Sequence, residues 1–454
     1  MTRVLIVGAG PAGMRAAETL AEAGLHPVVV DEAARAGGQI YRRPPEGFTR
    51  PAEKLYGSEA AKARRLHALF DRLVAEGRVT HLPERSVLAL SGGVAQVLGA
   101  VREEIAFDRL ILATGATDRL APVPGWESAG VYTLGAAQIA LKAQGVALGR
   151  RIVLAGSGPL LTLLATQLRA AGAEVAAVLD TAPMRAQIAA GAAMARARPQ
   201  TTLRGLRLRA ALGRRYHAGV TLERIETADG PVAMHWRDAR GRARRTACDM
   251  VGLGWHLRAD THLADLAGAR FDWSEPFRQW LPRCDALGRA GDGFYVAGDG
   301  QRLLGADGAE EAGRAAAIAC LQDLGLPHPA PAPVLRRLAR MERFAHALAR
   351  AFPWPAEAVR ALPDATVVCR CENISAGLLR ETLPLSGAEA NRAKSLSRVG
   401  MGRCQGRYCQ LAGAEIVAAS AGRSVAEAGR LRAQPPARPA PIGAWLATGD
   451  PGAE

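Results

Sequence analysis

A glycine-rich turn between an apolar run and a helical pattern constrains the fold of this chain more than any other feature. Residues 4–7 are continuously apolar, as a strand buried inside a parallel sheet requires, and they lead directly into Gly8-Ala9-Gly10-Pro11-Ala12-Gly13. A helical pattern then extends to Ala23, and a second apolar run, residues 28–30, is closed by Asp31. This order predicts a strand–helix–strand unit whose first turn binds a dinucleotide.

Each glycine of this turn has a physical role. Gly8 allows the tight turn, Gly10 lets the backbone approach a pyrophosphate, and Gly13 permits close packing of the helix on the strand. The free N–H groups and the positive dipole end of the helix favour that pyrophosphate. Asp31 is placed to accept hydrogen bonds from a ribose hydroxyl. The turn by itself does not choose between NAD and FAD.

The same pattern recurs once. Residues 151–155 form an apolar run that leads to Gly156-Ser157-Gly158 and then to another helix and strand. Leu161 stands where a third small residue is expected. Asp180 lies one residue farther from the glycine that ends its helix than Asp31 does in the first unit. Arg185 could bind a 2′-phosphate. The second turn therefore predicts a nucleotide site, with NAD(P), FMN and ATP as alternative ligands, or a retained fold whose site is altered or empty.

Composition sets broader limits. At about 150 residues per domain, 454 residues predict about three domains. The net charge of +15 comes from 58 basic and 43 acidic residues, but the arginines are scattered, so we expect no nucleic-acid partner. The longest uncharged apolar stretch, residues 152–168, is shorter than the ~20 residues of a membrane span. With no signal peptide at the start, we expect a cytoplasmic protein without a transmembrane segment, and its electron acceptor could associate it with the inner face of a membrane.

Four of the seven cysteines lie close together in the sequence: Cys369, Cys371, Cys404 and Cys409. Four thiolates can hold an iron–sulfur cluster or a structural zinc ion. No histidine lies inside this segment, so a Rieske centre is unsupported. The remaining cysteines are isolated, form no redox pair, and are interpreted as small buried apolar residues: Cys248, Cys284 and Cys320.

The first turn, together with Ala113-Thr114-Gly115 and Tyr295-Val296-Ala297-Gly298-Asp299, resembles the two-dinucleotide-binding flavoprotein superfamily. The resemblance implies an α/β fold, with a Rossmann-like FAD domain split around a second Rossmann-like domain. It also implies that Asp299 faces the ribityl chain and that the helix near Glu310 points toward the flavin. The residues expected to bind nucleotides are Gly8, Gly10, Pro11, Ala12, Gly13, Asp31, Glu32, Gly38, Gln39, Ala113, Thr114, Gly115, Gly156, Gly158, Gly298, Asp299 and Glu310. No catalytic side chain is expected, because the chemistry would belong to the flavin.

The segment Cys369-Arg-Cys-Glu-Asn-Ile-Ser with Gly400-Met-Gly-Arg-Cys-Gln-Gly-Arg-Tyr-Cys409 resembles the bacterioferritin-associated-ferredoxin-like domain. That resemblance implies a small helical module whose four cysteines hold a [2Fe-2S] cluster. Zinc and no metal are the alternatives.

Nearly the whole chain resembles the α subunits of heteromeric amino-acid and opine dehydrogenases, a group that includes octopine and nopaline oxidases, hydroxyproline and proline dehydrogenases and hydrogen cyanide synthase. Asp31-Glu32, Gly37-Gly38-Gln39-Ile40-Tyr41-Arg42 and Pro441-Ile442-Gly443-Ala444 carry this resemblance. It implies an electron-transferring subunit beside a flavoprotein β subunit of the D-amino-acid-oxidase-like type. That β subunit would oxidise the C–N bond of an amino acid, imino acid or opine. A small ferredoxin-like γ subunit and a downstream electron acceptor are further expected partners.

Two other interpretations stay open: a self-contained NAD(P)H:acceptor oxidoreductase, and an interaction scaffold with structural cofactors. The expected domains are an FAD-binding domain (1–118 and 285–326), a second, NAD(P)-type nucleotide domain (119–284), a linker and helix (327–364), the [2Fe-2S] domain (365–430) and a proline-rich tail (431–454).

Overall fold

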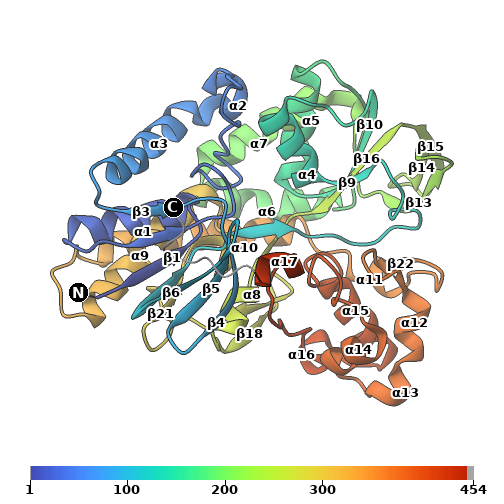
Figure 1. The fold of residues 1–454 in the computed structure, drawn as a ribbon. Helices are drawn as coiled ribbons and strands as arrows, with labels where there is room; N and C mark the ends of the chain where they lie inside the picture. The colour runs from blue at the N-terminus through green and yellow to red at the C-terminus, as the bar shows by residue number, and fades with distance from the viewer. Residues whose placement is uncertain (1, 447–454) are drawn as a thin grey trace.

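The computed structural model describes residues 2–446 (Figure 1). Two mostly parallel sheets with helices around them form most of the molecule, and a group of short helices follows them in sequence. Within residues 2–446, no helix is both long enough and apolar enough to cross a membrane. The expected tail lies partly outside the described residues, which end at 446.

The first sheet has the strand order β20-β21-β7-β1-β2-β3. Its central strand β1 (Val4–Val7) is fully buried and pairs in parallel with β2 (Val28–Val30) and β7 (Arg109–Leu112). Late in the chain, β21 (Phe294–Val296) adds to β7 in parallel. The outer strands are β3 (Thr80–Leu82) and β20 (Arg289–Gly291). The first sheet therefore combines strands from the beginning of the chain with two strands from much later in the sequence.

Two helices cross closely on this sheet, α1 (Pro11–Glu22) and α9 (Gly305–Asp323) (Figure 1). Their contact is possible because glycine removes side chains at the crossing. A Cβ atom on Gly313 would lie 2.0 Å from the carbonyl oxygen of Ala12, and one on Gly13 would lie 1.8 Å from that of Gly8. The third glycine of the predicted turn thus does what its position predicts, because it lets α1 pack against the loop and the strand.

The second sheet has the order β12-β11-β10-β16-β9 and contains the second predicted unit. Here β10 (Arg151–Ser157), α5 (Pro159–Ala170) and β11 (Glu174–Asp180) follow one another as the pattern predicts. The other strands are β9 (Val131–Thr133), β12 (Tyr216–Ala218) and β16 (Met250–Trp255). Around it lie the helices α4 (Leu134–Ile139), α6 (Met184–Ala197) and α7 (Pro199–Leu212) and the antiparallel strands β13 (Thr221–Thr227), β14 (Pro231–Arg237) and β15 (Ala243–Ala247).

Smaller elements complete the core. The predicted meander is an antiparallel sheet of β4 (Ser86–Ser91), β5 (Val94–Leu98) and β6 (Arg102–Ala106). Two short antiparallel pairs and three helices make up the remainder: β8 (Ala116–Asp118) with β17 (Leu257–Ala259), β18 (Phe271–Ser274) with β19 (Gln279–Pro282), α2 (Ala52–Tyr56), α3 (Ala60–Ala75) and α8 (His262–Leu266).

After α10 (Ala332–Ala351), the chain forms a small module of short helices and one hairpin (Figure 1). Its elements are α11 (Ala356–Arg360), β22 (Val367–Cys369), β23 (Ile374–Ser375), α12 (Ala376–Glu381), α13 (Leu383–Ser386), α14 (Ala390–Ser397), α15 (Gln410–Ser420) and α16 (Val425–Ala428). Its apolar residues share one core with the second sheet, and this core includes Trp126, Trp255, Val368 and Ile416. The chain ends its described part with α17 (Ile442–Leu446).

The crossing of α1 and α9 yields a stability prediction. Gly313→Ala places a methyl group against the backbone of α1, and we expect it to destabilise the fold by about 1–3 kcal/mol. Gly191→Ala is the matched control, because Gly191 lies inside α6 with no heavy atom within 4 Å of the added carbon. That control should be neutral or slightly stabilising, since alanine is the better helix former. Equal thermal midpoints for the two variants would contradict the role assigned to Gly313.

Candidate functional site

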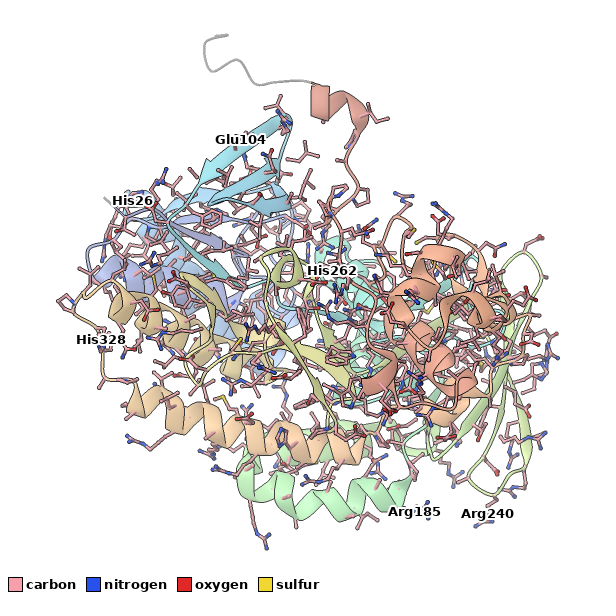
Figure 2. All side chains as sticks on the ribbon, turned by 90° about the horizontal axis from the view of Figure 1, so that it is seen from below. His26, Glu104, Arg185, Arg240, His262 and His328 are labelled. Atoms are coloured by element: carbon pink, nitrogen blue, oxygen red, sulfur yellow. The ribbon has the colours of Figure 1, made fainter. Side chains whose placement is uncertain are left out.

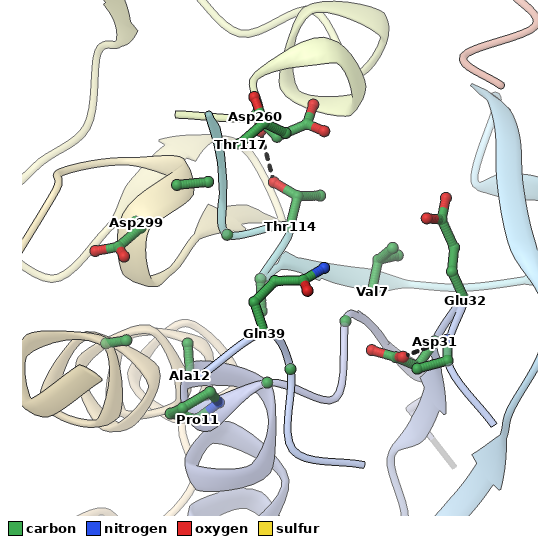
Figure 3. A pocket seen from close by; sticks show the side chains of 18 of the residues that line it. Val7, Pro11, Ala12, Asp31, Glu32, Gln39, Thr114, Thr117, Asp260 and Asp299 are labelled. Carbon is green, nitrogen blue, oxygen red and sulfur yellow. Dashed lines mark hydrogen bonds between the residues drawn. The ribbon is translucent and has the colours of Figure 1, made fainter. Parts of the chain in front are cut away.

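A cavity of about 510 Å³ opens at the end of the first sheet where β1, β2 and β7 finish (Figure 3). Most of the residues expected to bind a nucleotide line it: Gly8, Gly10, Pro11, Ala12, Asp31, Glu32, Gly38, Gln39, Ala113, Thr114, Gly115 and Asp299. Its size is within the range of sites that enclose small molecules and cofactors. Five expected residues do not line it: Gly13, Gly156, Gly158, Gly298 and Glu310.

The first glycine turn forms one wall of the cavity. Gly8 has φ +106°, and a Cβ there would lie 2.4 Å from the carbonyl oxygen of Ala113, so only glycine suits this position. Gly38 approaches Gly10 so closely that its Cβ would lie 2.9 Å from the Cα of Gly10. Because α1 begins at Pro11, its free N–H end faces the same space. This wall is bare backbone of the kind that a pyrophosphate requires.

The two acidic residues after β2 have different partners. The carboxylate of Asp31 accepts hydrogen bonds from the backbone N–H of Ala9 at 2.5 Å and of Ala33 at 2.7 Å. Burial nonetheless raises the pKa of Asp31 above its ordinary value. Glu32 instead pairs with Arg438 at 2.5 Å, across the edge of the cavity. Asp31 therefore holds the glycine turn in shape, and Glu32 is the carboxylate at the rim.

Asp299 and Glu310, both expected near the flavin, lie differently. Asp299 lines the cavity and accepts hydrogen bonds from the N–H groups of Leu304 and Gly305, while burial raises its pKa to about 6. Glu310 lies inside α9 and pairs with Arg15 at 2.8 Å and Lys62 at 2.7 Å. Glu310 thus ties α1 and α3 to α9, and other residues of α9, Ala306 and Ala309, reach the cavity.

Several lining residues were not expected from the sequence. Asp260 and Arg407 meet in the wall through an ion pair of 2.9 Å, and Thr114 donates a hydrogen bond to the carbonyl oxygen of Asp260 (Figure 3). From the C-terminal segment, Arg438 reaches the rim, and Ala437 donates its N–H to the carbonyl oxygen of Leu88 at 2.7 Å. No local pattern marks these residues, because their partners lie far away in the sequence.

The cavity fits an FAD molecule in three respects. It offers a glycine wall and a helix N-terminus for a pyrophosphate, and carboxylates at two separate places for hydroxyl groups. A Cβ on Gly10 would lie 3.7 Å from the Cα of Gly38, so these two glycines let their segments pass close together at this wall. None of the described residues lining the cavity is a cysteine.

The second glycine turn differs from the first in the groups that cover it. Gly156 and Gly158 are both buried, and a Cβ on Gly156 would lie 1.8 Å from the carbonyl oxygen of Gly254, much as a Cβ on its counterpart Gly8 would meet Ala113. The ring of His256 covers Gly158, with its Cδ2 atom 3.0 Å from where a Cβ would stand. Leu161 is fully buried in the core of this sheet, so the bulky residue is accommodated by repacking.

The carboxylate of this second unit is also engaged. Asp180 is 1% exposed and accepts hydrogen bonds from the hydroxyl of Tyr216 at 2.6 Å and the N–H of Ala182 at 2.8 Å. Burial raises the pKa of Asp180 to about 6, although these two hydrogen bonds act to lower it. Arg185 is exposed at the start of α6 (Figure 2). Asp31 also accepts two hydrogen bonds from the protein but lines the cavity, so burial is what distinguishes Asp180 from it.

The four expected cluster cysteines come together in the C-terminal module. Cys409 interacts with Cys369 and with Cys404, and Cys404 also interacts with Cys371. The hydrogen bond with Cys409 and the N–H groups of Gly400 and Glu372 lower the pKa of Cys369 to about 6. Cys404 is stabilised in the same way by Cys409 and by backbone N–H groups, and its pKa is lowered to about 5.

Gly402 lets the chain pass close to one of these cysteines. A Cβ on Gly402 would lie 2.3 Å from the Cβ of Cys371, so this approach requires glycine. Among residues 2–446, no three His, Cys, Asp or Glu side chains converge as the ligands of a single metal ion would. The other cysteines lie apart from the group, and burial raises the pKa of each thiol to about 11 or 12: Cys248, Cys284 and Cys320.

Two parallel sheets, a glycine turn on each and a cavity at the first define a dinucleotide-binding oxidoreductase. The sequence model of the pyridine nucleotide-disulphide oxidoreductase family matches residues 2–267, and the chain belongs to this family. It is an FAD-dependent oxidoreductase, which confirms that expectation. A second model, described as the sarcosine oxidase A3 domain, matches residues 386–449.

Curated relatives resemble the chain over almost its whole length. An opine oxidase subunit from Rhizobium meliloti is 38% identical, over 96% of this chain and 85% of the relative. Hydrogen cyanide synthase subunit HcnB of Pseudomonas aeruginosa is 31% identical, over 98% of both chains. Among solved structures, L-proline dehydrogenase from P. horikoshii has a TM-score of 0.70 at 20% identity, covering 98% of this chain and 80% of that one. At that identity the likeness shows the fold.

The closed second unit yields a pH-dependent prediction. The pKa of Asp180 is higher in the fold than in the unfolded chain, so its contribution to stability is present at low pH and falls as the pH rises from about 4 to 6. Tyr216→Phe removes a hydrogen bond that the charged carboxylate accepts. We therefore expect a loss of about 1–3 kcal/mol at pH 8 and a smaller loss at pH 5. Urea unfolding at both pH values measures this difference.

Tyr132→Phe is the matched control, because within the described residues the hydroxyl of Tyr132 makes no hydrogen bond, and this variant should be near neutral at both pH values. A Tyr216→Phe loss that does not change with pH would contradict the assigned partner.

Proposed function

We propose that this chain is the electron-transferring flavoprotein subunit of a heteromeric dehydrogenase. The partner subunit oxidises a C–N single bond of an amino acid, imino acid or opine to C=N, which releases two electrons and two protons. This chain receives those electrons at FAD and passes them through a [2Fe-2S] cluster to a downstream acceptor. The relatives from opine oxidase and hydrogen cyanide synthase support a subunit role, since their names describe parts of larger enzymes.

The second glycine turn supports a partner as the electron source. Asp180 is held by Tyr216, and Gly158 lies under His256, so the usual surface for a nicotinamide nucleotide is covered by this chain. An NAD(P)H:acceptor oxidoreductase would need that surface open. We therefore infer that NAD(P)H is not the electron donor and that the second unit serves mainly as a structural platform for the C-terminal module.

The cysteine group supports the cluster. A two-iron cluster needs four thiolates spread around two iron atoms, so its ligands do not converge on one point. Backbone N–H groups directed at Cys369 and Cys404 favour their thiolate forms, and hydrogen bonds to sulfur are among the features that tune such clusters. We propose Cys369, Cys371, Cys404 and Cys409 as the ligands, in a domain over residues 365–430.

The observation that carries the proposal is the contact between the cysteine segment and the flavin cavity. Arg407 lies between Cys404 and Cys409 in sequence, yet its guanidinium lines the cavity and pairs with Asp260. A flavin can accept two electrons and release them singly, whereas a [2Fe-2S] cluster takes one at a time. The cavity residues would hold FAD and the four cysteines would hold the cluster, and the pair of Asp260 and Arg407 joins these two parts of the chain. The FAD domain would be built from residues 1–118 and 285–326, and the second domain from 119–284.

Cofactor analysis of the purified complex tests this proposal directly. We expect one FAD, with iron and acid-labile sulfide in a 2:2 ratio for each copy of the chain, and an electron paramagnetic resonance signal after reduction. Cys404→Ser should lose iron, sulfide and signal but keep FAD. Cys248→Ala is the matched control, since Cys248 lies outside the module, and it should keep all three. Zinc in place of iron would contradict the cluster.

Anaerobic stopped-flow spectroscopy tests the electron source. Mixing the complex with its C–N substrate should bleach the flavin, whereas NADH and NADPH should bleach it at least 100-fold more slowly, because the second unit is closed. Tyr216→Phe serves as a control, since loosening Asp180 alone should not create a nicotinamide site. Fast bleaching by NADH or NADPH would favour a self-contained oxidoreductase instead.

A further inference from the structure

One buried carboxylate lies in the wall between the flavin cavity and the cysteine segment. Asp260 follows β17 directly, is 5% exposed, and belongs to the residues that line the cavity (Figure 3). Its backbone is fixed from the cavity side: its N–H donates to the carbonyl oxygen of Gly115 at 3.0 Å, and its carbonyl accepts from Thr114 at 2.7 Å. Any group bound to Asp260 therefore has a fixed position relative to the cavity.

The cysteine segment binds this carboxylate from the other side. The Nε atom of Arg407 donates to Asp260 at 2.9 Å, and its Nη1 atom donates to the carbonyl oxygens of Cys404 and Ala437, each at 3.2 Å. The ring of His262 lies between the Asp260 carboxylate, at 2.9 Å, and the carbonyl oxygen of Gln405, at 2.6 Å. Arg407 thus touches the cavity and a cysteine of the group with one side chain.

A second buried cation lies beside it. Arg258 is 4% exposed, and its Nη1 atom donates to the carbonyl oxygens of Gly406 and Arg407 at 3.3 and 3.0 Å. Within residues 2–446, Arg258 makes no ion pair with a carboxylate. Burial lowers the pKa of Arg258, while Asp260 and the nearby cysteines Cys409 and Cys404 favour its charged form.

The charges in this wall do not balance. Two arginines, Arg258 and Arg407, are buried there beside one carboxylate, Asp260. Arg438 also approaches this carboxylate, at 3.7 Å, but Glu32 compensates its charge. Burying a charge is costly unless an opposite charge compensates it. The thiolate group supplies the compensating charge, because Cys404 and Cys409 flank the loop whose carbonyls hold Arg258.

We propose that Arg258 and Arg407 are positioning residues that compensate the negative charge of the four-thiolate group and thereby raise the reduction potential of the cluster it holds. This inference rests on the proposed function. Reduction adds one negative charge to a cluster that is already negative, and a buried cation stabilises the reduced form more than the oxidised form. The same arginines hold the cysteine loop against the cavity wall through their hydrogen bonds. The contact that compensates the charge therefore also fixes the position of the loop.

A redox titration monitored by electron paramagnetic resonance tests the inference on the purified complex. Arg258→Met and Arg407→Met should each make reduction about tenfold less favourable, a fall of about 59 mV for one electron. Arg403→Met is the matched control: Arg403 precedes Cys404 but is exposed, so solvent and salt screen its charge. Its midpoint potential should stay at the wild-type value.

Lysine variants separate charge from folding. Arg258→Lys and Arg407→Lys keep the positive charge but lose the fork of donors, so their midpoint potentials should stay closer to wild type than those of the methionine variants. A signal at wild-type potential in both methionine variants would overturn the inference while leaving the cluster intact. If the methionine and lysine variants shifted the midpoint potential equally, the effect would come from packing and not from charge. That result would also overturn the inference. A wild-type complex without iron, sulfide or signal would instead contradict the proposed function itself.

Discussion

The approach of bare backbone to bare backbone around the first glycine turn is the constraint on which the rest of the structure depends. Gly8 lies against the carbonyl of Ala113, Gly13 against that of Gly8, and Gly313 against that of Ala12. These contacts bring α1 close to β1 and to α9, and this crossing leaves the ends of the central strands free to form a cavity. A methyl group at any of them would separate elements that must touch, because backbone atoms have no rotamer with which to make room.

The same strand–helix–strand unit serves two different purposes in this chain. In the first unit the glycine turn borders a cavity, and its carboxylate Asp31 holds the turn. In the second unit the turn is covered, Asp180 is satisfied by Tyr216, and the sheet shares its apolar core with the cysteine module. The unit is stable in both cases because its packing comes from the buried strands, so ligand binding is a property of the surface at the turn.

The parts of the site predicted from the sequence are those whose residues act on near neighbours. The glycines of the first turn and the pairs Cys369–Cys371 and Cys404–Cys409 are recognisable by their spacing, because each motif closes within a few residues. Asp260 and Arg438 belong to no local sequence motif. Asp260 pairs with Arg407, 147 residues away in the sequence, and Arg438 pairs with Glu32, 406 residues away. Glu310 was expected at the flavin from its position on the helix, but its pairing with Arg15 and Lys62 depends on how three helices cross.

The arginine excess, diffuse in the sequence, has a definite place inside the fold. Arg119 is buried and donates to the carbonyl oxygens of Phe277 and Arg278, just as Arg258 donates to carbonyls of the cysteine loop. A guanidinium has five donors and keeps its charge when buried, so it can join segments through backbone oxygens where no carboxylate is available. Carbonyls satisfy the hydrogen bonds but not the charge. Each such junction therefore leaves a positive potential inside the protein, which favours anionic groups in its neighbourhood, and one of these junctions lies between the cavity and the four thiols.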